Sequence, residues 1–325
     1  MSESILEVQD LKTFFDTDMG IVKAVNGVSF SVGRGQTVGI VGESGCGKSM
    51  TAMSIMKLIP KNGRIAGGKI SFQGQDITHY TREQMNRING KEISIIFQEP
   101  MTSLNPVFTV GYQIAETLIY HEHQSKAQAR KQAVEMIDTV GIPRADEIFD
   151  EYPHELSGGM RQRIMIAMAL ACHPSLLIAD EPTTALDVTI QAQILDLLRK
   201  MKKDFGMSIM MITHDLGVIA EMAEYVVVMY AGRIVERGPV LDIFRHPSHP
   251  YTIGLLKSKP RLNERRDRLY SIPGQVPNLI GLPDQCYFYD RCDRHQAVCK
   301  NGFPREIEVG PGHFVACTAF EGGNR

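Results

Sequence analysis

The sequence predicts an α/β fold in which a mainly parallel but mixed sheet is covered by helices on both faces. Short apolar runs with strand character alternate with segments of helical apolar spacing. One strand leads directly into a glycine-rich turn, and four of the six cysteines fall in the last forty of the 325 residues. We therefore expect a large core over residues 1–255 and a small cysteine-rich extension over residues 256–325.

The composition is that of a globular protein, with 43% hydrophobic and 22% charged residues. Thirty-five basic residues against thirty-seven acidic ones leave a net charge of -2, so no nucleic-acid partner is expected. The first residues lack the basic start and apolar run of a signal peptide, and no apolar stretch approaches the roughly 20 residues that span a bilayer. We expect a cytosolic chain.

The first part of the chain alternates strands and helices. Strands are predicted at residues 5–8, around 22–30, at 36–41, at 70–73 and at 93–97. A helix is predicted over residues 48–59, because Ala52, Ile55, Met56 and Ile59 have helical spacing. A capping box of Thr81 and Gln84 predicts a short helix over residues 81–88.

From about residue 100 to 172 the pattern is helical, with a second capping box at Ser125 and Gln128. We expect this region to form a helical subdomain. Strands return at residues 176–179, 208–213 and 225–229. Helices separate them at 188–205, ended by Gly206, and at 215–223.

The turn Gly42-Glu-Ser-Gly-Cys-Gly-Lys-Ser49 has the phosphate-loop pattern and lies between a predicted strand and a predicted helix. Its glycines let backbone amides face an anion, Lys48 can reach the outer phosphates, and Ser49 can ligate Mg²⁺. The alternative is a chance glycine-rich turn. The sequence thus predicts a Mg²⁺–ATP site formed by Gly42, Ser44, Gly45, Cys46, Gly47, Lys48, Ser49 and Met50.

Cys46 lies within this loop, where its side chain is incidental to binding. A position at a helix N-terminus lowers a thiol pKa. On that ground Cys46 could still be an alkylation target that blocks nucleotide entry.

An apolar strand ends in the two carboxylates Asp180 and Glu181. At the end of a buried strand, Asp180 can hold Mg²⁺ through water, and Glu181 can polarise the water that attacks the γ-phosphate. Taken alone, such a pair is more often an exposed strand end.

The segment Leu156-Ser-Gly-Gly-Met160 resembles the L-S-G-G-Q signature of the ABC (ATP-binding cassette) ATPase family. The resemblance implies that Ser157, Gly158 and Gly159, which open a helix, contact ATP held by the opposite subunit. Met160 departs from the family's usual Gln.

Other family elements follow in order: Gln98, Ala185-Leu-Asp187 and His214. By resemblance, Gln98 contacts Mg²⁺ or the water and senses the membrane partner, Asp187 bridges two cassettes, and His214 contacts the γ-phosphate. Phe15 resembles the aromatic residue that stacks on adenine. It could equally be a core residue, since Phe14 beside it competes for that role.

The tail His246-Pro-Ser-His-Pro-Tyr-Thr252, with the cysteines beyond it, is similar to the dipeptide and oligopeptide importer branch. The implied partners are a second cassette, two transmembrane permease subunits and an extracytoplasmic substrate-binding protein. The branch usually pairs two different cassettes, and the sequence does not decide between such a partner and a copy of this chain. The chain would then sit at the cytoplasmic face of the membrane. Nickel and glutathione importers share this tail, and a non-transport ABC ATPase is the alternative of another class.

Cys286, Cys292, Cys299 and Cys317 are separated by five, six and seventeen residues, which is not the C-x-x-C pairing of common zinc ribbons. Four thiolates could hold zinc or a 4Fe-4S cluster, or could be buried free thiols, and the spacing does not choose between them. Resemblance to peptide-importer cassettes favours the 4Fe-4S cluster, in a structural role.

Overall fold

The computed structural model describes residues 3–98, 103–184, 186–258 and 270–321. The chain divides into two compact units, each assembled from segments that are distant in the sequence. The first unit comprises Met1–Ile5, Val32–Gln36 and His79–Met211. The second unit comprises Leu6–Ser31, Thr37–Thr78 and Ile212–Arg325.

The first unit contains the strand order β8-β7-β6. Strand β6 (Ile93–Ile96) pairs in parallel with β7 (Leu176–Asp180), and β8 (Ser208–Ile212) is the other neighbour of β7. Every residue of β7 and β8 is buried, as expected for short apolar strands inside a parallel sheet. The three strands predicted from their apolar runs are confirmed.

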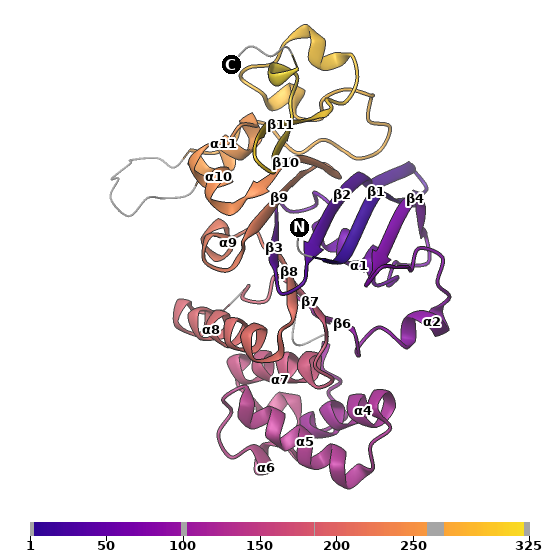
Figure 1. Ribbon diagram of the computed structural model, residues 1–325, viewed down its shortest axis with the longest axis vertical. Coiled ribbons are helices and arrows are strands. Elements are labelled where there is room, and N and C mark those ends of the chain that lie inside the picture. The colour runs from indigo at the N-terminus through magenta and orange to yellow at the C-terminus, as the bar shows by residue number, and fades with distance from the viewer. Residues whose placement is uncertain (1–2, 99–102, 185, 259–269, 322–325) are drawn as a thin grey trace. The chain divides into compact units, whose positions relative to one another are not determined.

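The helices of the first unit include a bundle of four, α4 to α7, which pack on one another (Figure 1). Both predicted capping boxes are present, at the starts of α2 and α5. Gly206, with a φ of 63°, ends the longest helix at the predicted residue. The helices are α2 (Arg82–Asn86), α4 (Val110–Glu122), α5 (Lys126–Thr139), α6 (Ala145–Ile148), α7 (Gly158–Leu170) and α8 (Val188–Phe205).

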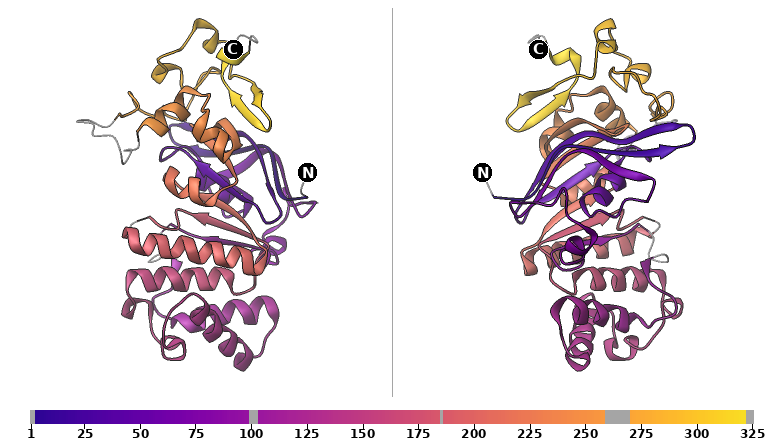
Figure 2. Two further views of the ribbon diagram at one scale, coloured as in Figure 1. Left: turned by 60° about the vertical axis from the view of Figure 1, so that its left-hand side comes forward. Right: turned by 90° about the vertical axis from the view of Figure 1, so that its right-hand side faces the viewer.

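Most of a four-stranded sheet, in the order β2-β1-β4-β5, lies in the second unit. Strands β1 and β4 are antiparallel, with Leu6 opposite Phe72. The long strands β1 and β2 run side by side in both views of Figure 2. The strands are β1 (Ser4–Thr17), β2 (Gly20–Gly33), β4 (Gly63–Phe72) and β5 (Gln75–Asp76).

A second set of strands in this unit has the order β11-β12-β10-β9-β3. Strand β3 is parallel to β9, whereas β10 is antiparallel to both β9 and β12, so the sheet is mixed as predicted. The last three strands in the chain were not predicted from the sequence. The strands are β3 (Thr37–Val41), β9 (Tyr225–Tyr230), β10 (Arg233–Pro239), β11 (Glu306–Gly310) and β12 (His313–Ala316).

Glu236 on β10 joins three segments of the second unit. Its side chain is fully buried and accepts hydrogen bonds from the amides of Ser248 (2.7 Å) and His249 (2.9 Å). Its Oε1 also lies 2.8 Å from Nε2 of His313 on β12. A buried carboxylate is stable only when its oxygens are satisfied, so these contacts fix the His-Pro-Ser-His-Pro turn and the C-terminal hairpin to one strand.

The helices of the second unit are short. Helix α1 ends at Ile55, so the predicted extension to residue 59 is wrong. Lys57 adopts a left-handed φ of 54°, and the amide of Leu58 bonds back to the carbonyl of Met53 (2.8 Å), which closes the helix early. The helices are α1 (Lys48–Ile55), α9 (Leu216–Met222), α10 (Val240–Arg245) and α11 (Pro250–Lys257). Over the described ranges, none of the helices is both long and apolar enough to cross a bilayer.

Candidate functional site

The phosphate loop connects β3 to α1 in the second unit, and two of its glycines are required by their surroundings. Gly42 has a φ of 154° and Gly47 a φ of 101°. A Cβ atom at Gly42 would lie 2.2 Å from the carbonyl oxygen of Met229, and one at Gly47 would lie 2.3 Å from that of Ala24. Close backbone approach therefore fixes the loop at both of its ends.

The remaining loop residues leave one side of the loop open. Lys48 is 5% exposed, and its Nζ donates to the carbonyl oxygens of Gly42 (2.8 Å) and Glu43 (3.0 Å). Ser44 and Gly45 are exposed, and a Cβ atom at Gly45 would meet no atom within 4 Å. Ser49 and Met50 stand in the first turn of α1. The loop thus presents open space beside a helix N-terminus and a lysine, which suits an anion.

Cys46 is fully buried beneath the loop. Burial raises the pKa of its thiol, while the nearby Lys48 ammonium opposes the shift. Burial of the thiol therefore works against the alkylation that the sequence left open.

His214 follows β8 and belongs to the second unit. The amide of Thr213 donates to the carbonyl of Ile40 on β3 (3.2 Å), so His214 emerges beside the strand that leads into the phosphate loop. The His214 side chain is exposed, and the next residue, Asp215, caps α9 through the amide of Gly217 (2.7 Å). Its role as a γ-phosphate contact stays a prediction.

Phe15 lies on β1 opposite Gly63 of β4. A Cβ atom at Gly63 would lie 2.5 Å from the Phe15 ring, so the ring packs closely on that glycine. The side chain is half-buried. Packing and a remaining exposed face are both present, so adenine stacking stays a prediction.

In the first unit, two side chains donate hydrogen bonds to the Glu181 carboxylate oxygen that is expected to act on water. Oε2 of Glu181 accepts hydrogen bonds from Nε2 of Gln98 (3.0 Å) and from Oγ1 of Thr184 (2.8 Å). Glu181 has a left-handed φ of 49°, an uncommon conformation for a residue with a side chain. Asp180 ends β7 and is 5% exposed. The sequence reasoning thus grouped Gln98 and Glu181 correctly, but it did not identify Thr184.

The signature segment also lies in the first unit. Oγ of Ser157 accepts a hydrogen bond from the amide of Met160 (3.3 Å), so Ser157 caps α7. A Cβ atom at Gly158 would meet nothing within 4 Å, and the first turn carries no acidic residue. The helix N-terminus is therefore accessible to an anion from outside. Gly159 packs against Ile190 on α8, with 3.4 Å between its added Cβ and that side chain.

Asp187 caps α8 by accepting a hydrogen bond from the amide of Ile190 (2.9 Å), and it is exposed. Its predicted bridging role is not tested by this contact. Ala185 lies outside the described residues.

Gln162 was missed by the sequence reasoning. It lies on α7, is 2% exposed, and its Nε2 donates to the carbonyl of Pro182 (2.6 Å), one residue after Glu181. The signal was a polar residue on the buried face of an apolar helix. The contact ties the helix that begins with the signature segment to the loop that carries the predicted base.

The four C-terminal cysteines line one cavity of about 100 Å³, together with Phe288, Tyr289 and Thr318. Sγ of Cys299 lies 3.1 Å from Oγ1 of Thr318. Burial, together with the neighbouring thiols, raises the pKa of Cys286 to about 12. As the side chains stand, no three His, Cys, Asp or Glu residues of the described part of the chain form a group that could hold a single metal ion.

Two family models match the sequence. The model described as "ABC transporter" matches residues 25–184, and that described as "Oligopeptide/dipeptide transporter, C-terminal region" matches residues 235–299. The chain is 50% identical to the oligopeptide transport ATP-binding protein AppD of Bacillus subtilis (strain 168), covering 98% of this chain and 97% of that protein. It is also 50% identical to the oligopeptide transport ATP-binding protein OppD of Escherichia coli (strain K12), over 97% and 93% of the two chains.

Solved structures share the fold at lower identity. The ATP-binding cassette MJ0796, in a dimeric post-hydrolysis state bound to ADP and Pi, superposes with a TM-score of 0.66 at 25% identity, covering 72% of this chain and 98% of that one. The protein cbiO1 from Clostridium perfringens, part of the ABC transporter complex cbiONQ, gives 0.65 at 27% identity, covering 75% and 92%. With its phosphate loop, signature helix and Gln98–Glu181 pair, the chain belongs to the ABC transporter ATP-binding proteins, in the branch with the oligopeptide/dipeptide C-terminal region.

Proposed function

We propose that this chain is the ATP-hydrolysing subunit of an ABC importer of dipeptides and oligopeptides. The hydrogen-bonded arrangement of Gln98 and Thr184 around Glu181 carries the hydrolytic part, because it orients a carboxylate at the end of a buried strand. The C-terminal region and its relatives, which are named oligopeptide transport proteins, support the peptide part.

In the proposed reaction the phosphate loop binds the phosphates of ATP, with Lys48 at the outer ones. Ser49, Asp180 and Gln98 would hold Mg²⁺, which would neutralise part of the phosphate charge. Glu181 accepts a proton from the attacking water, and His214 contacts the γ-phosphate. Phe15 is assigned to the adenine ring.

A second cassette completes each proposed ATP site. The open N-terminus of α7, with Ser157, Gly158 and Gly159, suits the ATP of the opposite subunit, and Asp187 bridges the two cassettes. A dimeric relative of known structure supports such an assembly. We assign a different cassette as the partner, together with two permease subunits and an extracytoplasmic binding protein at the cytoplasmic face of the membrane.

We assign residues 1–255 to the ATPase cassette, with its helical subdomain at about 100–172, and residues 256–325 to the extension. Helices α4 to α7 support the subdomain. On this assignment, the extension carries the cysteine cavity.

The purified complex with its membrane subunits tests the proposal. In lipid nanodiscs, the binding protein loaded with a di- or pentapeptide is expected to raise the rate of phosphate release several-fold, and Lys48→Ala is expected to abolish the release. A rate raised by a nickel chelate or by glutathione, and not by peptides, would contradict the peptide assignment. Loss of all membrane partners on purification would favour a non-transport ATPase.

For the cysteine cavity we propose a 4Fe-4S cluster, with zinc as the alternative. Four thiols line one cavity, four thiolates are the usual ligands of a 4Fe-4S cluster, and the C-x-x-C pairs of common zinc ribbons are missing from the sequence. The thiols must lose their protons to bind. Because the Cys286 pKa is raised to about 12 without metal, binding is expected to strengthen as the pH rises.

Anaerobically purified protein is expected to contain iron and sulfide in equal amounts and to absorb visible light as iron–sulfur proteins do. Cys299→Ser should abolish both signals, whereas Cys172→Ser, at a cysteine outside the cavity, should leave them unchanged. Stoichiometric zinc without sulfide would select the alternative. Protein without either metal would refute both.

A further inference from the structure

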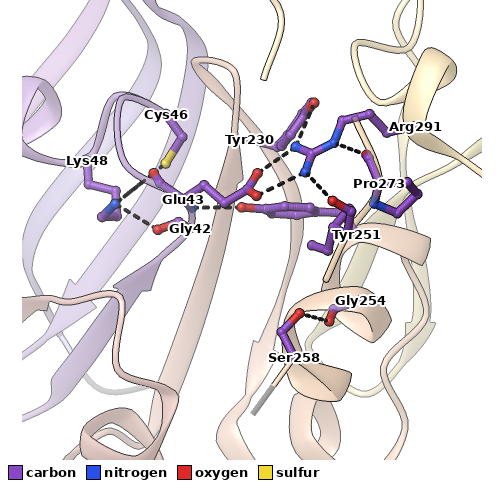
Figure 3. Close-up of polar contacts among 11 residues, drawn as sticks. Gly42, Glu43, Cys46, Lys48, Tyr230, Tyr251, Gly254, Ser258, Pro273 and Arg291 are labelled. Atoms are coloured by element: carbon purple, nitrogen blue, oxygen red, sulfur yellow. Dashed lines mark hydrogen bonds and ion pairs between the residues drawn. The ribbon is translucent and has the colours of Figure 1, made fainter. Parts of the chain in front are cut away.

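The phosphate loop is held from the C-terminal segment of its own chain. Glu43, the second residue of the loop, forms a bidentate ion pair with Arg291, at 2.7 and 3.0 Å, and 248 positions separate the two residues (Figure 3). A fork of two parallel hydrogen bonds fixes both the position and the plane of the carboxylate. Both residues belong to the second unit.

Arg291 is itself immobilised, which makes it suited to position another group. Its side chain is 4% exposed, and its Nε donates to the carbonyl of Pro273 (2.8 Å). The guanidinium lies 5.7 Å from the ring centroid of Tyr230 and 5.8 Å from that of Phe288. With its donors engaged and two aromatic rings packed beside it, the guanidinium has little freedom to follow Glu43 if the loop moves.

A second contact holds the backbone of the same loop residue. The amide of Glu43 donates to the hydroxyl of Tyr251 (2.8 Å), a fully buried residue of α11 (Figure 3). The Tyr251 ring lies 4.7 Å from that of Tyr230 and 5.5 Å from that of Phe288. Glu43 is thus held at its side chain by Arg291 and at its amide by Tyr251, and both of these residues pack against Tyr230 and Phe288.

We propose that Arg291, supported by Tyr251, is a positioning residue of the ATP site. The carbonyl of Glu43 accepts a hydrogen bond from Lys48, so fixing Glu43 also fixes the lysine expected to contact the phosphates. A loop held in its binding conformation loses less entropy when ATP binds. The inference rests on the proposed function, in which this loop binds ATP.

Arg291 also connects the cysteine cavity of the extension to the phosphate loop. Arg291 directly precedes Cys292, and Phe288, which packs on its guanidinium, lines the cysteine cavity. Whatever orders that cavity also orders the residue that holds the loop.

The effect of Arg291 is expected to appear in ATP affinity and not in chemistry. Arg291→Ala should weaken ATP binding and raise KM about tenfold, the loss expected when one partner of a partly buried ion pair is removed, with kcat at saturating ATP within about twofold of wild type. Arg291→Lys, which keeps the charge but not the fork, should recover part of the affinity. Binding is measured by isothermal titration with ATP and Mg²⁺, and turnover by phosphate release.

Arg233→Ala is the matched control. Arg233 also lies over aromatic rings of the C-terminal segment, 4.3 Å from the centroid of Phe303. Within the described residues, its side chain forms no hydrogen bond or ion pair with the phosphate loop. It is expected to leave ATP affinity unchanged. Equal weakening by both alanine variants would mean general loss of packing and would overturn the proposal.

A double-mutant cycle separates this inference from the function on which it rests. Glu43→Gln should weaken binding by a similar factor, and adding Arg291→Ala to it should cost little more, since the pair is already broken. If the double variant lost ATP affinity by the product of the two single losses, the positioning role would be refuted. Unchanged ATP affinity in Arg291→Ala would refute it as well. If Lys48→Ala still binds ATP like wild type, the proposed site itself fails, whatever Arg291 does.

Discussion

Replacing Glu181 by Gln is expected to reduce ATP turnover by about 10²- to 10⁴-fold, the usual contribution of a general base. The glutamine amide keeps an oxygen that can accept from Gln98 and Thr184, so the local geometry should survive. The loss of the carboxylate's basicity should therefore slow proton transfer without preventing ATP binding. On the proposed two-cassette arrangement, the ATP-bound pair of cassettes should accumulate.

Phosphate release measures the turnover, and size-exclusion chromatography in ATP and Mg²⁺ measures the dimer. The matched control is Glu135→Gln, which changes an exposed α5 residue that forms an ion pair with Lys131, and this variant should hydrolyse ATP like wild type. Wild-type turnover by Glu181→Gln would remove this residue from its proposed role.

Gly42→Ala is expected to be the most damaging single-methyl change in the phosphate loop. The new Cβ would stand 2.2 Å from the carbonyl of Met229 on β9 and 2.6 Å from Sγ of Cys46, and the residue would keep a φ of 154°. The Met229 backbone cannot move aside as a flexible side chain can, so the methyl group would push β9 and the phosphate loop apart. The thermal midpoint should fall by about 5 °C or more, and ATP binding should be lost.

Gly45→Ala provides the comparison within the same loop. Gly45 also has a positive φ, 77°, but its Cβ would meet nothing within 4 Å. Only the backbone conformation is then penalised, by about 1–2 kcal/mol, so the midpoint should fall much less than for Gly42→Ala. Equal shifts in the two variants would show that backbone conformation alone, and not the approach of β9, makes glycine necessary at position 42.

Apolar periodicity and helix-ending residues correctly predicted helices whose ends are set by neighbouring residues in the sequence. The helix at Val188–Phe205 has both a clear apolar face and a glycine at its end, and the structure begins and ends it where expected. The helix at Lys48–Ile55 has the same periodicity beyond its end, yet Lys57 reverses the backbone. The apolar spacing shows which side chains are buried, but a turn can bury them as well as a helix can. It therefore does not fix where the helix ends.

The residues that position the candidate site were harder to predict from the sequence than the residues expected to contact ATP. Loop, carboxylates and signature are short contiguous patterns, so the sequence displays them. Arg291 and Glu43 meet across 248 positions, and nothing near Arg291 in the sequence distinguishes it from a surface arginine. Strand β10 escaped prediction because its partners are β9 and the distant β12, and its own sequence includes Glu236 and Arg237.

The buried Glu236 limits where this chain can be truncated. On β10, it stands between the cassette-side strand β9 and the C-terminal strand β12, and it pairs with His313 on the latter. A chain truncated after α11 would expose the free edge of β10 and leave a buried carboxylate one partner short. Open strand edges recruit other chains, so the shortened protein would aggregate instead of yielding a minimal soluble ATPase. In evolutionary terms, such an extension could not be gained or lost without remodelling the strand on which it is built.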